Sequence, residues 1–372
     1  MNNDVIIVGG GVIGCSVALK LAEAGLGVTV FERGRVGCEA SRAAAGMLAA
    51  QSETTVAGPF SDLCLQSRSM YRKFADHLTE ASGIDVEYDD SGLLFVMFDD
   101  EDSTTQWVSS RPEAGAELER LSASTVRELE PAVAESAAGA VFVRGDHQIE
   151  NRRLMDALGV AIRRAGVRVV EGVEISALTT ERGRVTGVVS DGDRIAAGVV
   201  IVAGGAWSSR LIEPLGLKGS VVPARGQMIA LKGQGCSINR VLHSSKVYLV
   251  PRRDGRILIG ATVEYAGFEK AVTVEGVRSL LSAATELVPS LMDLQIVEMW
   301  SGLRPDTVDH LPILGPAGVE GLVIATGHFR NGILLAPVTA ELLSELILTG
   351  RTPSGLAPFL NDRLQVCNES NN

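Results

Sequence analysis

The first part of the chain alternates between short apolar runs and one amphipathic stretch. Residues 5–8 are wholly apolar, which is typical of a strand buried on both faces. Residues 14–25 repeat apolar positions at helical spacing and end at a glycine, a common helix terminator. Residues 27–32 form a second apolar run. A strand, a helix and a strand within about 30 residues predict a βαβ unit with two parallel strands.

The rest of the chain interleaves helical patterns with strand patterns. Apolar spacing predicts further helices over residues 61–83, 152–165, 277–287 and 333–348. Asn151 stands immediately before the second of these, where asparagine is a favoured N-cap residue. Short strands separated by turns predict a meander over residues 167–190. Strand and turn patterns also dominate residues 85–145 and 220–300.

Two strand-rich regions interrupt the strand-and-helix units, and this interruption predicts two discontinuous domains. The first domain comprises residues 1–86, 146–219 and 301–372, and we expect it to be a nucleotide-binding Rossmann domain. The second comprises residues 87–145 and 220–300, and we expect an α+β substrate domain built on an antiparallel sheet. The predicted fold class is therefore α/β.

The composition is that of a globular protein, with 46% hydrophobic and 21% charged residues among 372. The net charge of −11 is unfavourable for a nucleic-acid partner, which needs a basic surface. The five cysteines form no CxxC pair, so we expect neither a disulfide framework nor a metal site. No apolar stretch is long enough to span a membrane, and the N-terminus lacks a secretory pattern, which predicts a cytoplasmic protein.

A glycine fingerprint lies between the first predicted strand and the first predicted helix. Gly9, Gly11 and Gly14 have the GxGxxG spacing, which permits a tight turn, a close backbone approach to a pyrophosphate and close helix packing. The helix N-terminus then offers N–H groups to the phosphates. Glu32 ends the second strand, where its carboxylate can accept hydrogen bonds from ribose hydroxyls. The alternative is a structural glycine-rich turn with Glu32 as an ordinary strand-end acid.

Three further segments narrow the choice of dinucleotide. The last predicted strand and helix, residues 322–348, return to the Rossmann fold from the far end of the chain, which favours a buried FAD over an exchanging NAD. Together with the fingerprint, residues 40–48 (ASRAAAGML), 302–305 (GLRP) and 328–337 (HFRNGILLAP) resemble the D-amino-acid oxidase family of FAD proteins. The resemblance covers nearly the whole chain and is strongest to the branch that serves thiamine biosynthesis. It implies a glutathione-reductase-like FAD-binding domain.

The resemblance implies which residues of this chain bind the cofactor and the substrate. For FAD it implies the residues Gly9, Gly11, Val12, Ile13, Gly14, Glu32, Arg33, Ala40, Ser41, Arg42, Ala45, Gly46, Met47, Val173, His328, Phe329, Arg330, Asn331, Gly332, Ile333 and Leu334. For the substrate it implies Arg304 and Tyr248 at the carboxylate and Arg330 at the amine side. The planar fork of an arginine matches a carboxylate with two parallel hydrogen bonds. As alternatives, both arginines would form surface salt bridges and Tyr248 would be a core residue.

Two departures from the family pattern bear on the cofactor and the pocket. Related enzymes that bind FAD covalently use a cysteine near the GLRP segment, but residues 305–315 contain none, so we expect noncovalent FAD. Val263 stands where glycine-oxidising members often carry a different apolar residue above the substrate. The size limit of the pocket therefore stays open.

The resemblance implies oxidation of glycine and other small amino acids, including sarcosine and small D-amino acids. Hydride would pass from the substrate α-carbon to the flavin without a protein base, and oxygen would reoxidise the flavin to give hydrogen peroxide. The imine would hydrolyse to the 2-oxo acid and ammonia, or supply the thiazole moiety of thiamine through thiazole synthase. We expect a homo-oligomer. The alternatives are a D-amino-acid dehydrogenase that passes electrons to a quinone or carrier, and a noncatalytic FAD-bearing subunit.

Overall fold

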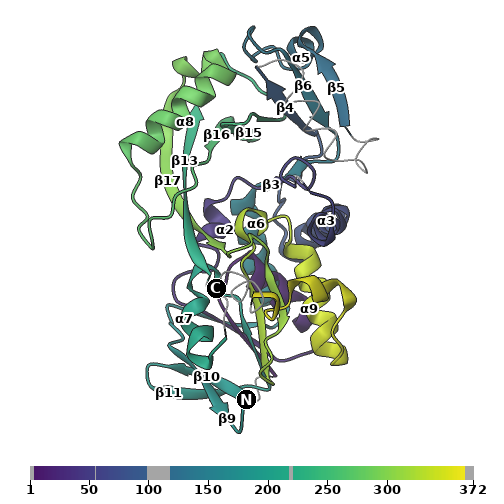
Figure 1. The fold of residues 1–372 in the computed structure, drawn as a ribbon, viewed down its shortest axis with the longest axis vertical. Helices are drawn as coiled ribbons and strands as arrows, with labels where there is room; N and C mark the ends of the chain where they lie inside the picture. Colours follow the sequence, from purple (N-terminus) through teal and green to yellow (C-terminus); the bar gives the residue numbers. More distant parts are fainter. Residues whose placement is uncertain (1–3, 55, 99–117, 218–220, 365–372) are drawn as a thin grey trace, which may run out of the picture.

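A largely parallel sheet forms the lower half of the molecule in Figure 1. The computed structural model describes residues 4–54, 56–98, 118–217 and 221–364. The strand order of this six-stranded sheet is β18 (Ile313–Pro316), β19 (Leu322–Thr326), β12 (Val199–Val202), β1 (Val5–Val8), β2 (Val28–Glu32) and β8 (Arg168–Glu171). Neighbouring strands are parallel except β18, which pairs with β19 antiparallel. The expected parallel pair β1–β2 is confirmed.

Four helices pack beside this sheet around one apolar core. They are α1 (Val12–Glu23), α3 (Pro59–Ser82), α6 (Asn151–Arg164) and α9 (Ala336–Thr349). Helix α1 contacts both α6 and α9, and α3 contacts the same two helices. Because β1 and β19 are covered on both faces, every one of their residues is buried, which explains why all of them except Thr326 are apolar.

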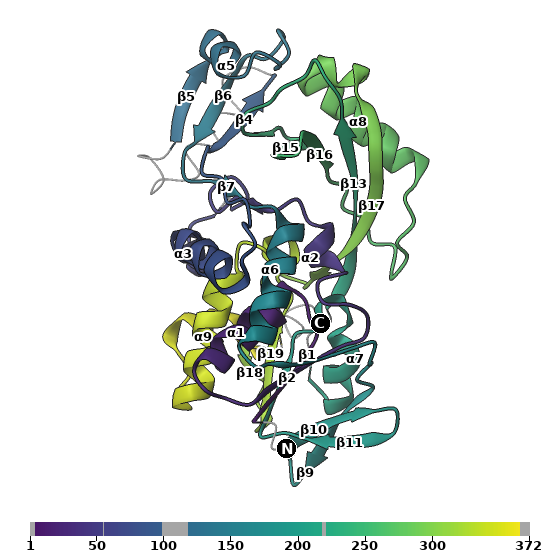
Figure 2. The same cartoon turned by 180° about the vertical axis from the view of Figure 1, so that it is seen from behind.

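An eight-stranded sheet forms the upper half of the molecule (Figures 1 and 2). Its order is β17 (Gln295–Asp306), β13 (Val222–Lys232), β16 (Arg256–Gly260), β15 (Tyr248–Pro251), β14 (Val241–His243), β4 (Leu93–Met97), β6 (Gly139–Val143) and β5 (Leu118–Ser122). Neighbours are antiparallel except β14 and β4, which run parallel. Helix α8 (Val274–Leu287) covers β13 and β16, and α5 (Ala123–Leu129) contacts β5 and β6.

Short elements complete the described fold. A three-stranded sheet contains β9 (Ala177–Glu181), β10 (Arg184–Ser190) and β11 (Asp193–Ala196), and β3 (Met47–Leu48) pairs with β7 (His147–Gln148). The short helices are α2 (Ala40–Ala43), α7 (Ser209–Ile212) and the 3-10 turns η2 (Gly205–Trp207), η3 (Glu213–Leu215), η4 (Pro289–Asp293), η5 (Phe329–Asn331) and η6 (Ser354–Phe359). No helix in the described ranges is both long and apolar enough to cross a membrane.

The long strands β13 and β17 descend from the upper sheet toward the lower half (Figure 2). They pair along most of their length, from Val222 opposite Asp306 to Lys232 opposite Gln295. Strand β17 crosses the predicted domain boundary at residue 300. The division of the chain into domains stays a prediction, although each sheet draws its strands from the ranges assigned to one domain, apart from the end of β17.

Three local expectations are wrong. Glu150, not Asn151, is the N-cap of α6, because its carboxylate accepts from the Arg153 N–H at 2.8 Å. The first strand of the predicted meander, β8, does not belong to the meander but pairs with β2 in the six-stranded sheet. The meander consists of β9, β10 and β11. The last helix begins at Ala336 rather than residue 333, because Pro337 has no N–H to donate and suits only a first helical turn.

Candidate functional site

The turn between β1 and α1 is shaped by close backbone contact. Gly9 has φ +112°, and a Cβ at Gly14 would lie 2.0 Å from the Gly9 carbonyl oxygen. A side chain at Gly14 would therefore push the helix away from the strand. The Val12 N–H at the start of α1 donates to Ser41 Oγ at 2.9 Å, which brings the segment after β2 against the helix N-terminus.

Glu32 is fixed at the end of β2 by backbone amides. Its two carboxylate oxygens accept from the Gly10 and Gly34 N–H groups, each at 2.8 Å. The side chain is 8% exposed and lines a cavity together with Arg33 and Val173. The carboxylate is thereby oriented before any ligand arrives.

Two adjoining cavities run from Glu32 to the upper sheet. The first, beside Glu32, has a volume of about 380 Å³. The second, the central cavity, has a volume of about 150 Å³. Both are lined by Gly11, Ala40, Ser41, Ala203 and Gly205. The central cavity is also lined by Val12, Ile13, Ala45, Gly46, Met47, His328, Phe329, Arg330, Asn331, Gly332 and Ile333.

Distant side chains hold the carbonyl groups of the segment 41–45. Asn151 Nδ2 donates to the Ser41 and Arg42 carbonyls at 2.9 and 3.0 Å, and Trp300 Nε1 donates to the Ala43 carbonyl at 2.9 Å. This explains why Asn151 is buried although it does not cap α6. The segment, which lines the central cavity, is therefore fixed from both halves of the molecule.

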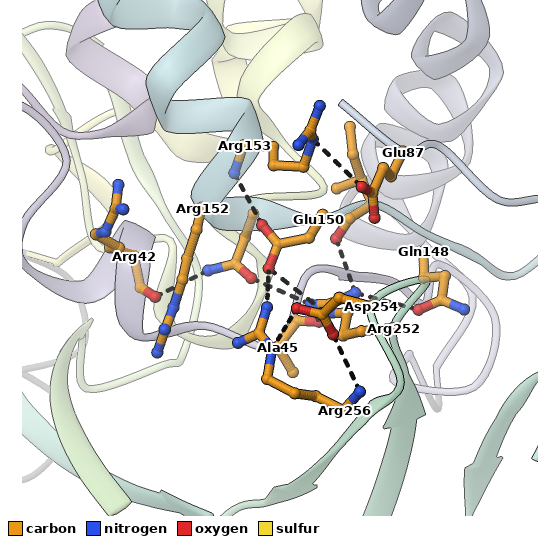
Figure 3. A network of polar contacts seen from close by, with 12 residues as sticks. Arg42, Ala45, Glu87, Gln148, Glu150, Arg152, Arg153, Arg252, Asp254 and Arg256 are labelled. Atoms are coloured by element: carbon orange, nitrogen blue, oxygen red, sulfur yellow. Dashed lines mark hydrogen bonds and ion pairs between the residues drawn. The ribbon is translucent and has the colours of Figure 1, made fainter. Parts of the chain in front are cut away.

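Arg252 provides the fourth of these contacts, from the end of the hairpin strand β15 (Figure 3). Its guanidinium donates to the Ala45 carbonyl at 2.6 Å, the Ile149 carbonyl at 3.3 Å and Asn151 Oδ1 at 3.2 Å. The residue is 8% exposed, and burial lowers the pKa of its guanidinium to about 10. Arg252 thus ties the upper sheet to the loop that lines the central cavity.

The upper sheet presents Arg304 and Tyr248 in a hollow made by two glycines. The four strands β17, β13, β16 and β15 are neighbours, and they carry Arg304, Gly226, Gly260 and Tyr248 respectively. A Cβ at Gly226 would lie 2.2 Å from the Arg304 guanidinium, and one at Gly260 would lie 2.5 Å from the Tyr248 ring. Glycine at these positions therefore lets both side chains lie against the sheet, facing the central cavity.

Charged and polar groups in this hollow influence one another. Burial lowers the pKa of Arg304, although the nearby Tyr248 hydroxyl and the Glu53 carboxylate oppose this shift. Burial raises the pKa of Tyr248, against the positive charges of Arg304 and Arg330. At neutral pH the site therefore holds a guanidinium cation beside a neutral phenol.

Comparisons with known proteins show which family the chain belongs to. Residues 4–346 match the family model described as DAO: FAD dependent oxidoreductase. A glycine oxidase of Pseudomonas aeruginosa is 37% identical over 95% of this chain and 96% of its own length. The bifunctional protein ThiO/ThiG of Synechocystis is 39% identical over 93% of this chain, which spans only 52% of that protein. The crystal structure of glycine oxidase from Geobacillus kaustophilus superposes with a TM-score of 0.91 at 36% identity, over 96% of this chain and 97% of that one.

The chain belongs to the DAO family of FAD-dependent oxidoreductases.

This membership confirms the family resemblance, the fold class and FAD as the cofactor. The described residues fit such a group, because small residues line the whole path between the two cavities. The N-terminus of α1 and Ser41 lie on this path, as phosphate binding requires, and Glu32 lies at its end.

Most of the implied binding residues line the two cavities, and three do not. Gly14 packs the helix on the strand, the Arg42 side chain pairs with Asp156 on the surface, and Leu334 is buried with its carbonyl bonded to Ser67. Val263 is 42% exposed and is absent from the described lining of the central cavity. The binding roles assigned to these positions stay predictions.

Arg330 has a partner in this DAO-family member that the sequence does not indicate. Its Nε and Nη2 donate to the two Glu53 oxygens at 2.7 and 2.6 Å. His243 lies close enough for its pKa to respond to both charges, and burial lowers that pKa to about 4. Neither Glu53 nor His243 belongs to a motif, and the two lie 190 positions apart. The sequence therefore does not indicate that they are close to each other.

His328 is a buried neutral residue at the start of the turn η5. It is 3% exposed, and its Nε2 lies 3.2 Å from Thr339 Oγ1. Burial lowers its pKa to about 3. His328 therefore adds no positive charge to the central cavity at neutral pH.

Proposed function

We propose that this chain catalyses the FAD-dependent oxidation of glycine and other small amino acids, such as sarcosine and small D-amino acids. The products are the imino or 2-oxo acid, ammonia and hydrogen peroxide. The observation that carries this proposal is the pairing of Arg304 and Tyr248 in the hollow above Gly226, in the same cavity as the segment 45–47. The similarity to glycine oxidases over nearly the full length supports it.

Arg304 and Tyr248 are suited to hold a substrate carboxylate. The Arg304 Nη1 donates to the Thr262 carbonyl at 3.0 Å, which helps to fix the guanidinium, and the guanidinium has further N–H donors. The neutral Tyr248 hydroxyl can donate to the same carboxylate. The substrate α-carbon is then held by its carboxylate in one orientation, and such positioning lowers the barrier without a proton transfer to the protein.

Noncovalent FAD is the proposed form of the cofactor, held by the residues that line the two cavities. Bound FAD supplies the hydride acceptor and passes the electrons to oxygen. Bound FAD would fill part of both cavities and help to exclude water from them.

We further propose that the imine supplies the thiazole moiety of thiamine, in a cytoplasmic homo-oligomer. The joined name of the ThiO/ThiG relative supports a link to thiazole synthase. The other readings, a D-amino-acid dehydrogenase and a noncatalytic subunit, lack a favouring observation here.

Anaerobic reduction of the purified yellow protein tests the proposed function. Glycine, sarcosine, D-alanine and D-proline are added separately, and bleaching of the flavin absorption is followed over time. We expect reduction by glycine or sarcosine, followed by stoichiometric hydrogen peroxide when air is admitted. If none of the four reduces the flavin, the proposal is wrong. Reduction without peroxide would instead indicate a dehydrogenase.

A further inference from the structure

Glu53 and Arg330 form a bidentate ion pair across a long stretch of sequence. Glu53 follows β3, Arg330 lies in η5, and they are 277 positions apart. The Glu53 side chain is 11% exposed and that of Arg330 is 33% exposed. Burial would raise the pKa of the Glu53 carboxyl, but the charge and hydrogen bonds of Arg330 outweigh it and lower the pKa. Glu53 is therefore an anion at neutral pH.

The ion pair lies between two cavities. Both residues line the central cavity with Arg304 and Tyr248. Both also line an outer cavity of about 690 Å³, together with His243 and Phe329. A substrate held by Arg304 in the central cavity would therefore have free space for a longer arm beyond the Glu53–Arg330 pair.

The Glu53–Arg330 pair sets the net charge of the residues that line the central cavity. Among the described residues that line the central cavity, the charged side chains are Glu53, Arg304 and Arg330. The nearby histidines His243 and His328 are neutral at pH 7 because burial lowers their pKa. The net charge of the lining is therefore +1, which matches one substrate carboxylate. A second carboxylate could not use the Arg330 donors that already bind Glu53. It would also be repelled by the negative charge of Glu53.

We propose that Glu53 is a specificity-determining residue that restricts the site to substrates with one carboxylate by neutralising Arg330. Removal of the Glu53 charge would free the Arg330 fork as a second anion site. The chain would then accept amino acids with a second carboxylate, whose arm extends toward the outer cavity. This inference rests on the proposed function in one respect, because Arg304 must hold the first carboxylate.

The test compares Glu53→Gln with Glu53→Asp in the FAD-loaded enzyme. Glutamine has nearly the same shape without the charge, whereas aspartate keeps the charge. Calorimetry gives the dissociation constants of acetate and malonate, which carry one and two carboxylates and cannot be oxidised. Anaerobic flavin reduction gives kcat/KM for glycine and for iminodiacetate, which is glycine with a second carboxylate arm on nitrogen.

For Glu53→Gln we expect the malonate-to-acetate and iminodiacetate-to-glycine preferences to rise at least about tenfold over wild type, since a like charge next to the second carboxylate is removed. Glu53→Asp should keep the wild-type preferences. An unchanged preference in Glu53→Gln, or an equal rise in Glu53→Asp, would overturn the proposal.

Arg330→Gln gives a second measurement that does not depend on the stability of Glu53→Gln. It leaves Glu53 without its partner, so the malonate-to-acetate preference should fall below that of wild type, and a rise would contradict the proposal. If wild type is not reduced by glycine, the proposed function fails, while the acetate and malonate affinities still report on Glu53 independently.

Discussion

The two adjoining cavities are built from different parts of the chain. We call the part beside Glu32 the nucleotide end and the part beside Arg304 and Tyr248 the substrate end, after their proposed ligands. At the nucleotide end, backbone groups dominate, and even the Glu32 carboxylate is held by the N–H groups of Gly10 and Gly34. At the substrate end, side chains dominate, and Arg330 and Glu53 hold each other from distant segments. The backbone end is fixed by one strand, one turn and one helix. The side-chain end exists only when several strands and loops have assembled, so damage at one end should be separable from damage at the other.

The largest effect is expected at the substrate end. Removal of one member of a buried, hydrogen-bonded charge pair costs about 2–5 kcal/mol. Arg304→Ala should therefore lower kcat/KM for glycine by a factor on the order of 30 to several thousand, measured by rapid anaerobic flavin reduction. The dissociation constant of FAD should stay near that of wild type, because Arg304 belongs to the substrate end.

Arg304→Lys serves as the matched control. It should recover only part of the lost activity, because a point charge cannot form the planar two-bond fork. Loss of FAD from Arg304→Ala, or full activity toward glycine, would show that the assignment of Arg304 is wrong and that the two ends are not separable.

This difference between the ends also explains how much the sequence could predict. The βαβ unit, the fingerprint and the position of Glu32 follow from local spacing within residues 5–32, and the structure places them as expected. Arg304 and Tyr248 were implied by their motif contexts. Glu53, Gly226 and the Arg252 contacts were not predictable, because each depends on a partner that only the tertiary fold brings near. Glu150 caps α6 in place of the predicted Asn151, because the Asn151 side chain donates to carbonyls of the segment after β2 instead.

Arg252 ties the upper sheet to the segment 41–45, which lies along both cavities, so its loss should affect both ends. Arg252→Met leaves the Ala45 and Ile149 carbonyls without this donor, and each unsatisfied buried acceptor costs about 1–3 kcal/mol. Because two acceptors lose this donor, we expect the free energy of unfolding in urea to fall by about 2 kcal/mol or more and FAD to bind more weakly. Arg253→Met is the control, because its pair with Asp85 is more than half exposed and contributes at most about 1 kcal/mol. Equal effects of Arg252→Met and Arg253→Met would show that the buried contacts of Arg252 do not stabilise the fold more than an exposed ion pair does.

A smaller effect is expected from a change at the nucleotide end alone. In Glu32→Gln an NH2 group replaces one of the two carboxylate oxygens. Either the Gly10 or the Gly34 N–H group then loses its acceptor and faces this NH2 group. The charge-assisted bonds to the ribose are also lost. Together these changes should weaken FAD binding about tenfold or somewhat more, at about 1.4 kcal/mol per decade. Fluorescence titration of the apoprotein with FAD measures this constant, and an unchanged value would mean that Glu32 does not contact the ribose.

An effect that is absent at neutral pH concerns His328, whose neutrality keeps the charge at the substrate end at +1. Its pKa is about 3 in the folded chain because of burial, against an ordinary value of about 6.5 when unfolded. Between these values the unfolded chain binds a proton that the folded chain does not, so this contribution to stability is complete above pH 6.5 and is lost as the pH falls toward 3. The slope is at most about 1.4 kcal/mol per pH unit.

His328→Asn keeps a polar side chain beside Thr339 but cannot titrate in this range. Urea unfolding of both proteins at pH 7, 6, 5 and 4.5 isolates the contribution of His328, because carboxyl groups elsewhere titrate in both. We expect the free energy of unfolding of wild type to fall more steeply than that of the variant below pH 6.5, with no difference in slope above it. Parallel curves across the whole range would mean that His328 titrates near its ordinary pKa in the folded chain. Below pH 6.5 the lining of the central cavity would then carry a charge of +2, and the match to a single substrate carboxylate would be lost there.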